Sequence, residues 1–329
     1  MAGFPAKRKH LFYTELEKLI EAGFGIREAA NALLESRPAA PERQLLESVL
    51  SALDRGETIA NAFAGNSTGN LERSIITAGE KGGKLGQAFQ HLADYFGLIA
   101  KARADALKAM IYPLILLHLG LVLAAIPSDV MSGGIAAEGV LGKLLLSVVG
   151  AWAMIALATL LLRLLLKMAP GHPTVDRLLN LVPLVGGARR NLAMARFTKV
   201  YHAGLVAGFS MGETALMAGE AAQSGTLREA SARLDATARA GNPLGPVFVS
   251  EQAFPRAFAK SYATAEESGM LDKDLLRWSR VFEENAAGSV RTLSVVLPKL
   301  GYALIVVFVL WKLVSFYSGY YESLEQIRL

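Results

Sequence analysis

The tripeptide Ala22-Gly23-Phe24, with Glu28 behind it, returns 185 residues later as Ala207-Gly208-Phe209 with Glu213 behind it. Further matches at the same offset are Gly56 with Gly241, Phe63 with Phe248, and Pro113 with Pro298. At an offset of 186 the matches are Glu80 with Glu266, Gly83 with Gly269, and Leu85 with Leu271. A nearly constant offset over so long a stretch indicates a tandem duplication with almost no net insertion.

The chain is unusually apolar, because 52% of its 329 residues are hydrophobic. Three runs approach the roughly 20 apolar residues that cross a bilayer about 30 Å thick. They lie at residues 109–126, 144–166 and 293–317. The sequence therefore predicts three transmembrane helices, and the first and third of them end the two copies of the repeat.

Loop charge predicts the orientation of these spans, because cytoplasmic segments beside a membrane are enriched in Lys and Arg. Lys101, Arg103 and Lys108 precede the first span, whereas residues 127–142 contain no Lys or Arg. We expect the N-terminus in the cytoplasm and the C-terminus in the periplasm. The expected topology has residues 1–108 and 167–292 in the cytoplasm, and residues 127–143 and 318–329 in the periplasm.

The number of spans follows from the duplication. Two copies of a soluble domain with one exit helix give two spans, and both domains face the same side only if a further helix brings the chain back. The span at 144–166 has no counterpart in the repeat and is predicted to be this return helix. The first and third spans should then run parallel to each other.

Both soluble copies have the apolar spacing of short helices. In copy one, Phe12, Leu16, Leu19 and Ile20 form a stripe at i, i+4, i+7 and i+8 that ends at Gly23. The alternating pattern of a strand is absent from the sequence. We therefore expect an all-α membrane protein with three transmembrane helices and two homologous cytoplasmic antiparallel helical bundles of about six helices each.

The residues that carry most catalytic and cofactor chemistry are missing or badly spaced. There is no cysteine, and the five histidines have no spacing typical of metal ligands. Residues 1–108 hold 14 Lys and Arg against 13 Asp and Glu, so a nucleic-acid-binding face is not expected. His118 lies inside the first span, where a hydrogen bond between helices is favoured over a proton relay. The sequence predicts no catalytic residue, cofactor or metal site.

The string Gly79-Glu80-Lys81-Gly82-Gly83-Lys84 resembles a phosphate-binding loop only superficially, because Leu85 stands where Ser or Thr would follow the lysine. A turn between helices is favoured, with Gly83 and Gly269 in a left-handed or close-packed backbone. Glu80 and Glu266 lie one turn earlier, where each could cap the next helix or pair with a neighbouring one. We expect the matched positions to be structural or partner-facing.

Three motifs occur in each copy in the same order: A-G-hydrophobe…E, then G-x-x-hydrophobe…F, then a corner close to G-E-x-S-G-x-L. Each copy departs from this corner once, with Gly82 for Ser in copy one and Ala265 for the first Gly in copy two. With a proline-marked membrane helix after each copy, the set resembles the inner-membrane platform proteins of type II secretion and type IV pilus assembly (protein F and PilC). The resemblance extends from about Phe12 to Val314.

This resemblance implies a non-enzymatic, multi-pass protein of the bacterial inner membrane. The implied partners are a hexameric secretion or pilus ATPase on the cytoplasmic side, other inner-membrane assembly components, pilins or pseudopilins in the membrane, and further copies of the chain. Pro113 and Pro298 would then be hinges between bundle and membrane, or simply kinks. The alternatives are an unrelated three-span membrane scaffold or signalling protein and, less favoured, a small transporter.

Overall fold

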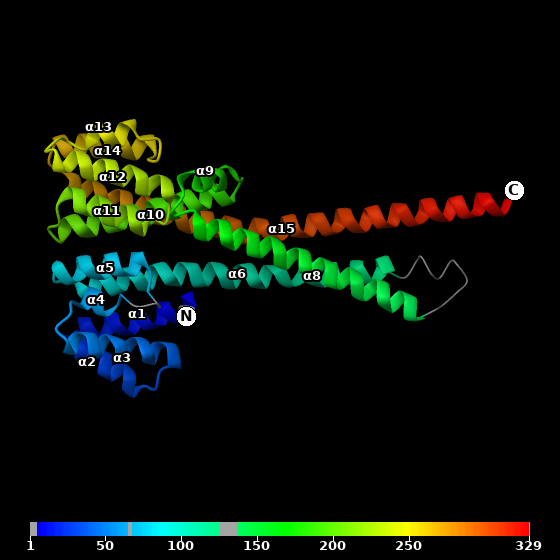
Figure 1. Cartoon of the computed structure of the whole chain (residues 1–329), viewed down its shortest axis with the longest axis horizontal. Helices are drawn as coiled ribbons and strands as arrows, with labels where there is room; N and C mark the ends of the chain where they lie inside the picture. The colour runs from blue at the N-terminus through cyan, green and yellow to red at the C-terminus, as the bar shows by residue number, and fades with distance from the viewer. Residues whose placement is uncertain (1–4, 65–67, 126–136, 329) are drawn as a thin grey trace. The chain divides into compact units, whose positions relative to one another are not determined.

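The computed structural model describes residues 5–64, 68–125 and 137–328 (Figure 1). Over these ranges the chain forms fourteen α-helices and no strand. The prediction of an all-α protein is therefore confirmed. Most of the connection predicted at 127–143 falls on residues 126–136, outside the described residues.

The duplication is visible helix by helix. Copy one contains α1 (Ala6–Glu21), α2 (Ile26–Glu35), α3 (Ala40–Asp54), α4 (Ile59–Ala62), α5 (Asn70–Lys81) and the start of α6 (Leu85–Ala125). Copy two contains α10 (Val185–Val206), α11 (Met211–Ala221), α12 (Gly225–Arg239), α13 (Gly245–Ser250), α14 (Arg256–Glu267) and the start of α15 (Leu271–Arg328). Between the copies lie α8 (Ala137–Met168) and α9 (Pro173–Leu181), which have no counterpart in copy one.

Both copies of the repeat belong to one compact unit, which comprises residues 1–101 and 166–290. Its hydrophobic core draws side chains from both copies, and Phe63 and Phe248 at matched positions are both fully buried. Burying a phenylalanine contributes about 1.5–3 kcal/mol, so these aromatic side chains are major sources of stability. The two bundles therefore pack against each other and are not independent domains.

A second unit comprises residues 102–165 and 291–329. Among the described helices, three have segments long and apolar enough to span a membrane, namely Leu85–Leu121, Val148–Met168 and Leu271–Trp311. These segments confirm the three predicted apolar spans by length and composition. Large apolar side chains on α8 are exposed, such as Leu146 at 75% and Met154 at 69%, as expected of a helix surrounded by lipid.

In this second unit α6 and α15 run parallel, as the repeat predicts. Three contacts define the direction: Ser294 Oγ donates to the Ala102 carbonyl over 3.1 Å, the rings of Tyr112 and Tyr302 lie 5.7 Å apart, and a Cβ added to Gly120 would lie 2.8 Å from Val309 Cγ2. The residue numbers rise together along both helices, which is possible only for a parallel pair. Gly120 allows close approach, as small residues do between membrane helices.

His118 joins α6 to α8 within the same unit. The indole Nε1–H of Trp152 donates to His118 Nε2 over 3.3 Å, and His118 Nδ1 lies 2.7 Å from the Leu114 carbonyl oxygen. Since the carbonyl requires a donor, Nδ1 carries the proton and Nε2 accepts from the indole. The predicted hydrogen bond between membrane helices is thus confirmed.

The bundle and membrane segments at the end of each copy form one uninterrupted helix. Residues Leu85–Ala125 are helical throughout α6 with Pro113 inside, and Leu271–Arg328 are helical throughout α15 with Pro298 inside. No helix boundary falls at residue 108 or 292, where the two predicted cytoplasmic segments end. Each proline removes one backbone N–H donor, yet the sequence on both sides of it is largely apolar and the helix continues.

Candidate functional site at the helix corners and between the repeats

The six glycines that the repeat singles out share one conformation. Their φ angles are +91° at Gly23, +76° at Gly56, +64° at Gly83, +77° at Gly208, +74° at Gly241 and +68° at Gly269. Each follows the C-terminal end of a helix, where a left-handed residue ends the helix and satisfies its last carbonyl groups. Residues with a Cβ are strained in this region, so backbone geometry favours glycine at these six positions.

Glu80 and Glu266 cap short helices in matched ways. Glu80 accepts hydrogen bonds from the N–H groups of Ile59 (2.7 Å) and Ala60 (2.9 Å) at the start of α4. Glu266 accepts from the N–H groups of Leu244 (2.8 Å) and Gly245 (2.6 Å) at the start of α13. Each carboxylate thus satisfies donors of a helix earlier in the chain, not of the helix that follows it.

Replacing Glu266 by glutamine is expected to lower the free energy of unfolding by about 1–2 kcal/mol, because the amide NH2 cannot accept one of the two hydrogen bonds at α13 and the other loses its charge. The measurement is urea unfolding of the full chain in detergent micelles, followed by tryptophan fluorescence. Glu267→Gln is the matched control, because Glu267 is the exposed neighbour of Glu266. Equal stability of the two variants would contradict the capping role.

The remaining matched residues lie at helix starts, in the core or in the membrane helices. Glu28 and Glu213 sit at the third position of α2 and α11 and accept from the N–H groups of Gly25 (3.0 Å) and Ser210 (3.3 Å), respectively. Leu85 and Leu271 begin α6 and α15 and pack against the core. The matched residues are thus spread over equivalent corners of the two copies and do not converge on one site.

The buried polar groups of the two copies differ, which sequence reasoning missed. In copy one, Lys9 Nζ donates to both carboxylate oxygens of Glu72 over 2.8 and 2.6 Å, and Tyr13 Oη–H donates to the same carboxylate over 2.7 Å. Burial and, next, the charge of Glu72 raise the pKa of Tyr13, so the phenol stays protonated. The matched residues of copy two are Met194, Thr198 and Phe258.

Copy two has its own buried polar pair at places that are apolar in copy one. The hydroxyl groups of Tyr201 and Tyr262 lie 2.9 Å apart, and both side chains are fully buried. Their counterparts are Leu16 and Ile76. Aligning the copies at offsets of 185 and 186 would have revealed both exchanges, because each sets residues that need a hydrogen-bond partner, such as Lys9, Glu72 and Tyr201, against apolar Met, Phe and Leu.

The two copies pack through unlike surfaces, with α5 of copy one against α10 and α11 of copy two. The Arg196 guanidinium of α10 donates through Nε to the Tyr95 hydroxyl of α6 over 2.8 Å. At the other end Lys81 Nζ lies 3.5 Å from the centre of the Phe209 ring, a cation–π contact. This surface was not predicted, because sequence periodicity does not say which bundle faces meet.

His91 makes this surface sensitive to pH. Burial, with the positive charge of Lys199 and of His202, lowers the pKa of His91 to about 4. The unfolded chain takes up a proton near pH 6.5, whereas the folded chain does not until about pH 4. The contribution of His91 to stability is therefore complete above pH 6.5 and declines as the pH falls.

Full-length protein in detergent micelles is expected to lose stability between pH 7 and pH 5, and His91→Gln is expected to reduce that loss. The measurement is the midpoint of urea unfolding at each pH, with each protein compared to its own midpoint at pH 7. If the wild type and His91→Gln showed the same change, His91 would not be the titrating group responsible.

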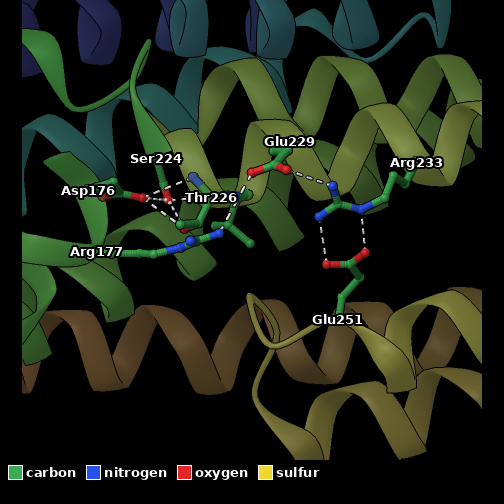
Figure 2. Close-up of polar contacts among 8 residues, drawn as sticks. Asp176, Arg177, Ser224, Thr226, Glu229, Arg233 and Glu251 are labelled. Carbon is green, nitrogen blue, oxygen red and sulfur yellow. Dashed lines mark hydrogen bonds and ion pairs between the residues drawn. The ribbon is translucent and has the colours of Figure 1, made fainter. Parts of the chain in front are cut away.

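A polar cavity of about 960 Å³ lies beside copy two, where α9 meets α12. Figure 2 shows Asp176 surrounded by donors: Ser224 Oγ at 2.5 Å, and the N–H and Oγ1 of Thr226 at 3.1 and 2.8 Å. Arg189 also donates to Asp176 over 2.5 Å. Burial acts to raise the pKa of Asp176, but these hydrogen bonds outweigh it and hold the pKa below its usual value.

The basic residues drawn around this cavity are paired within the chain. Arg233 binds both carboxylate oxygens of Glu251 and also pairs with Glu229 over 2.9 Å (Figure 2). Arg177 lies 4.0 Å from the second oxygen of Glu229. The arrangement is a network of ion pairs that links α9, α12 and the segment after α13. It joins charged side chains to each other.

Comparison with known proteins finds similarity over most of the chain. Residues 12–127 match the family model described as type II secretion system (T2SS), protein F. The type II secretion system protein F of Aeromonas hydrophila is 27% identical over 289 residues, which cover 81% of this chain and 74% of that protein. Protein F of Pseudomonas aeruginosa is 25% identical, over 88% of this chain and 76% of that protein.

A second group of relatives carries a different name. The type IV pilus assembly protein PilC of Thermus thermophilus is 22% identical over 308 residues, which cover 88% of this chain and 76% of that protein. PilC of Pseudomonas aeruginosa is 21% identical, over 95% of this chain and 88% of that protein. The resemblance is therefore confirmed: residues 12–127 match the type II secretion system protein F family, and the likeness to protein F and PilC extends over most of the chain.

Proposed function

We propose that the protein is a non-enzymatic inner-membrane platform of a type II secretion or type IV pilus machine. The observation that carries this proposal is the combination of a protein F domain, relatives named protein F and PilC, and three apolar helices long enough to span a membrane. Charges that neutralise one another in the large cavity support a structural role. An unrelated three-span scaffold would share the helices but not the family domain.

The platform would couple a cytoplasmic secretion ATPase to pilins or pseudopilins in the membrane. Two features support this coupling. Both bundles belong to one packed unit, so a displacement of either bundle is transmitted to the other. In addition, α6 and α15 each lead from this unit into an apolar segment without a helix end, so motion of the bundles is passed along continuous helices. The orientation that goes with it has both bundles and the N-terminus in the cytoplasm.

The experiment that tests the proposal is co-purification of the full chain, in detergent, with the secretion ATPase encoded in the same organism. A stable complex that survives washing at moderate salt is expected. The control is the ATPase alone on the same resin. Absence of the complex, together with normal secretion and pilus assembly in cells that lack the protein, would support the unrelated scaffold instead.

Pro113 and Pro298 are expected to matter for coupling rather than folding. Each removes one backbone hydrogen bond inside a long helix and makes that position easier to bend. Pro113→Ala combined with Pro298→Ala is therefore expected to leave protein levels unchanged or raised, and to reduce secretion or pilus assembly several-fold. The measurement is secreted substrate or surface pilin per cell at matched protein levels. Unchanged assembly would show that the prolines are not hinges.

A further inference from the structure

The surface that holds the two copies together exists twice in the chain. In copy two the receiving side is the corner between α10 and α11, and it holds the C-terminal end of α5. Lys81 Nζ lies over the Phe209 ring, and a Cβ added to Gly82 would lie 3.4 Å from Ala207 Cα. A helix that ends Lys-Gly is thus seated on an aromatic ring and an alanine.

A carboxylate completes this receiving corner. Hydrogen bonds from Ser210 lower the pKa of Glu213, and the charge of Lys81 lowers it further. The Lys81 ammonium group is therefore attracted both by the face of the Phe209 ring and by the negative charge of Glu213. Both interactions favour a cation at this position.

Copy one has the same receiving corner without an occupant from copy two. Ala22, Phe24 and Glu28 stand at the positions of Ala207, Phe209 and Glu213. All three are exposed, and 45% of Phe24 is accessible although it is a large apolar side chain. A cavity of about 450 Å³ lies beside it, lined by Phe24, Ile20, Ile26 and the corner that precedes α6.

The exposed surface continues along α1. Lys7, Leu11 and Lys18 are exposed, and 51% of Leu11 is accessible. Their counterparts in α10 are Leu192, Arg196 and Ala203, which are partly buried. Positions 7, 11 and 18 share one face of a helix, so the open surface is a stripe that leads to Phe24.

The two copies pack through different faces, and this explains why the receiving corner of copy one stays open. The face of copy one at α5 meets the face of copy two at α10 and α11, so the contact is of the head-to-tail kind. A head-to-tail pair uses one receiving face and leaves the other free. The matching helix end in copy two is that of α14, where Glu267 and Ser268 replace Lys81 and Gly82. A carboxylate there would meet the negative ring face and Glu28.

The geometry points to a docking surface on copy one, formed by Leu11, Ala22, Phe24 and Glu28, for a helix of a partner protein that ends in Lys-Gly. The lysine ammonium lies over the Phe24 ring beside Glu28, and the glycine lies against Ala22. Apolar side chains one and two turns earlier in the partner helix cover Leu11. This inference holds whichever machine the platform serves.

The test uses full-length protein in detergent micelles and a labelled peptide of residues 70–84, stapled into a helix, which contains the natural Lys81-Gly82 end. Saturable binding is expected by fluorescence anisotropy. Phe24→Ala in the protein and Lys81→Glu in the peptide should each weaken binding at least fivefold. Val249→Ala is the matched control, since Val249 is an exposed apolar residue elsewhere in copy two, and it should leave binding unchanged.

Three results would overturn the proposal. The first is no saturable binding of the helical peptide. The second is binding that Phe209→Ala weakens and Phe24→Ala does not, which would mean that the peptide displaces α5 from copy two. The third is a dimer of the full chain, seen by light scattering, that Phe24→Ala dissociates, because a second copy would then be the occupant.

Discussion

Lys9→Met is expected to lower the free energy of unfolding by about 3–5 kcal/mol, because it leaves the buried Glu72 carboxylate without its cation. The side chain of Glu72 is 3% exposed, so water cannot replace the ammonium group that lies 2.6 Å from it. The Tyr13 hydroxyl and the Gly69 N–H still donate one hydrogen bond each, but neither carries the positive charge that is lost. Urea unfolding of the full chain in detergent micelles measures the loss.

The repeat supplies the rescue for this variant. Combining Lys9→Met, Tyr13→Thr and Glu72→Phe gives copy one the residues that copy two has at the matched positions. Because the charge is removed together with its partner, the triple variant should be more stable than Lys9→Met alone. A triple variant that is less stable than the single one would show that the copies are not packed equivalently at this place.

Gly225→Ala is expected to destabilise the protein by about 3 kcal/mol. A Cβ at this position would lie 2.7 Å from the carbonyl oxygen of Ala169 and 2.9 Å from backbone atoms of His172 and Pro173. Backbone at such distances must move, and α9 begins at Pro173. The movement would also weaken the hydrogen bonds from Ser224 and Thr226 to Asp176.

Gly187→Ala is the control for this substitution. Gly187 lies in the first turn of α10, and nothing lies within 4 Å of a Cβ added there. The control should be neutral or slightly stabilising, because alanine favours a helix more than glycine does. Equal urea midpoints for Gly225→Ala and the wild type would contradict the close approach of α12 to the segment before α9.

Much of the architecture was predictable because the chain states it twice. Glycines at a constant offset mark the helix ends, since a left-handed residue is required wherever a helix turns sharply. The number of spans predicted that α6 and α15 run parallel. Both helices leave a bundle on the same side of the membrane, so they cross it in the same direction. His118 was predictable in kind, because a polar group inside a membrane helix needs a partner.

Other features depend on contacts that a single sequence does not report. Glu80 caps α4 rather than α6 because the fold brings α4 to the end of α5, and spacing along the chain favours the nearer helix. The pairing of Asp176 with Ser224 and Thr226 joins residues that are 48 and 50 positions apart. Pro113 and Pro298 indicated hinges or kinks, and apolar sequence on both sides continues the helix through them.

The central claim is that both repeat bundles lie on the cytoplasmic side, where one motor could act on them as a unit. The chain has no cysteine, so single-cysteine variants report topology without background. Glu47→Cys tests copy one, Glu220→Cys tests copy two, and Gly142→Cys tests the segment before the return helix. All three positions are exposed.

The measurement is labelling by a membrane-impermeant maleimide in cells whose outer membrane alone is permeabilised. Gly142→Cys should react in these cells, and Glu47→Cys and Glu220→Cys should react only after the inner membrane is broken. Reaction of either bundle variant while the inner membrane is intact would contradict the account, because the two copies would then not both face the cytoplasm.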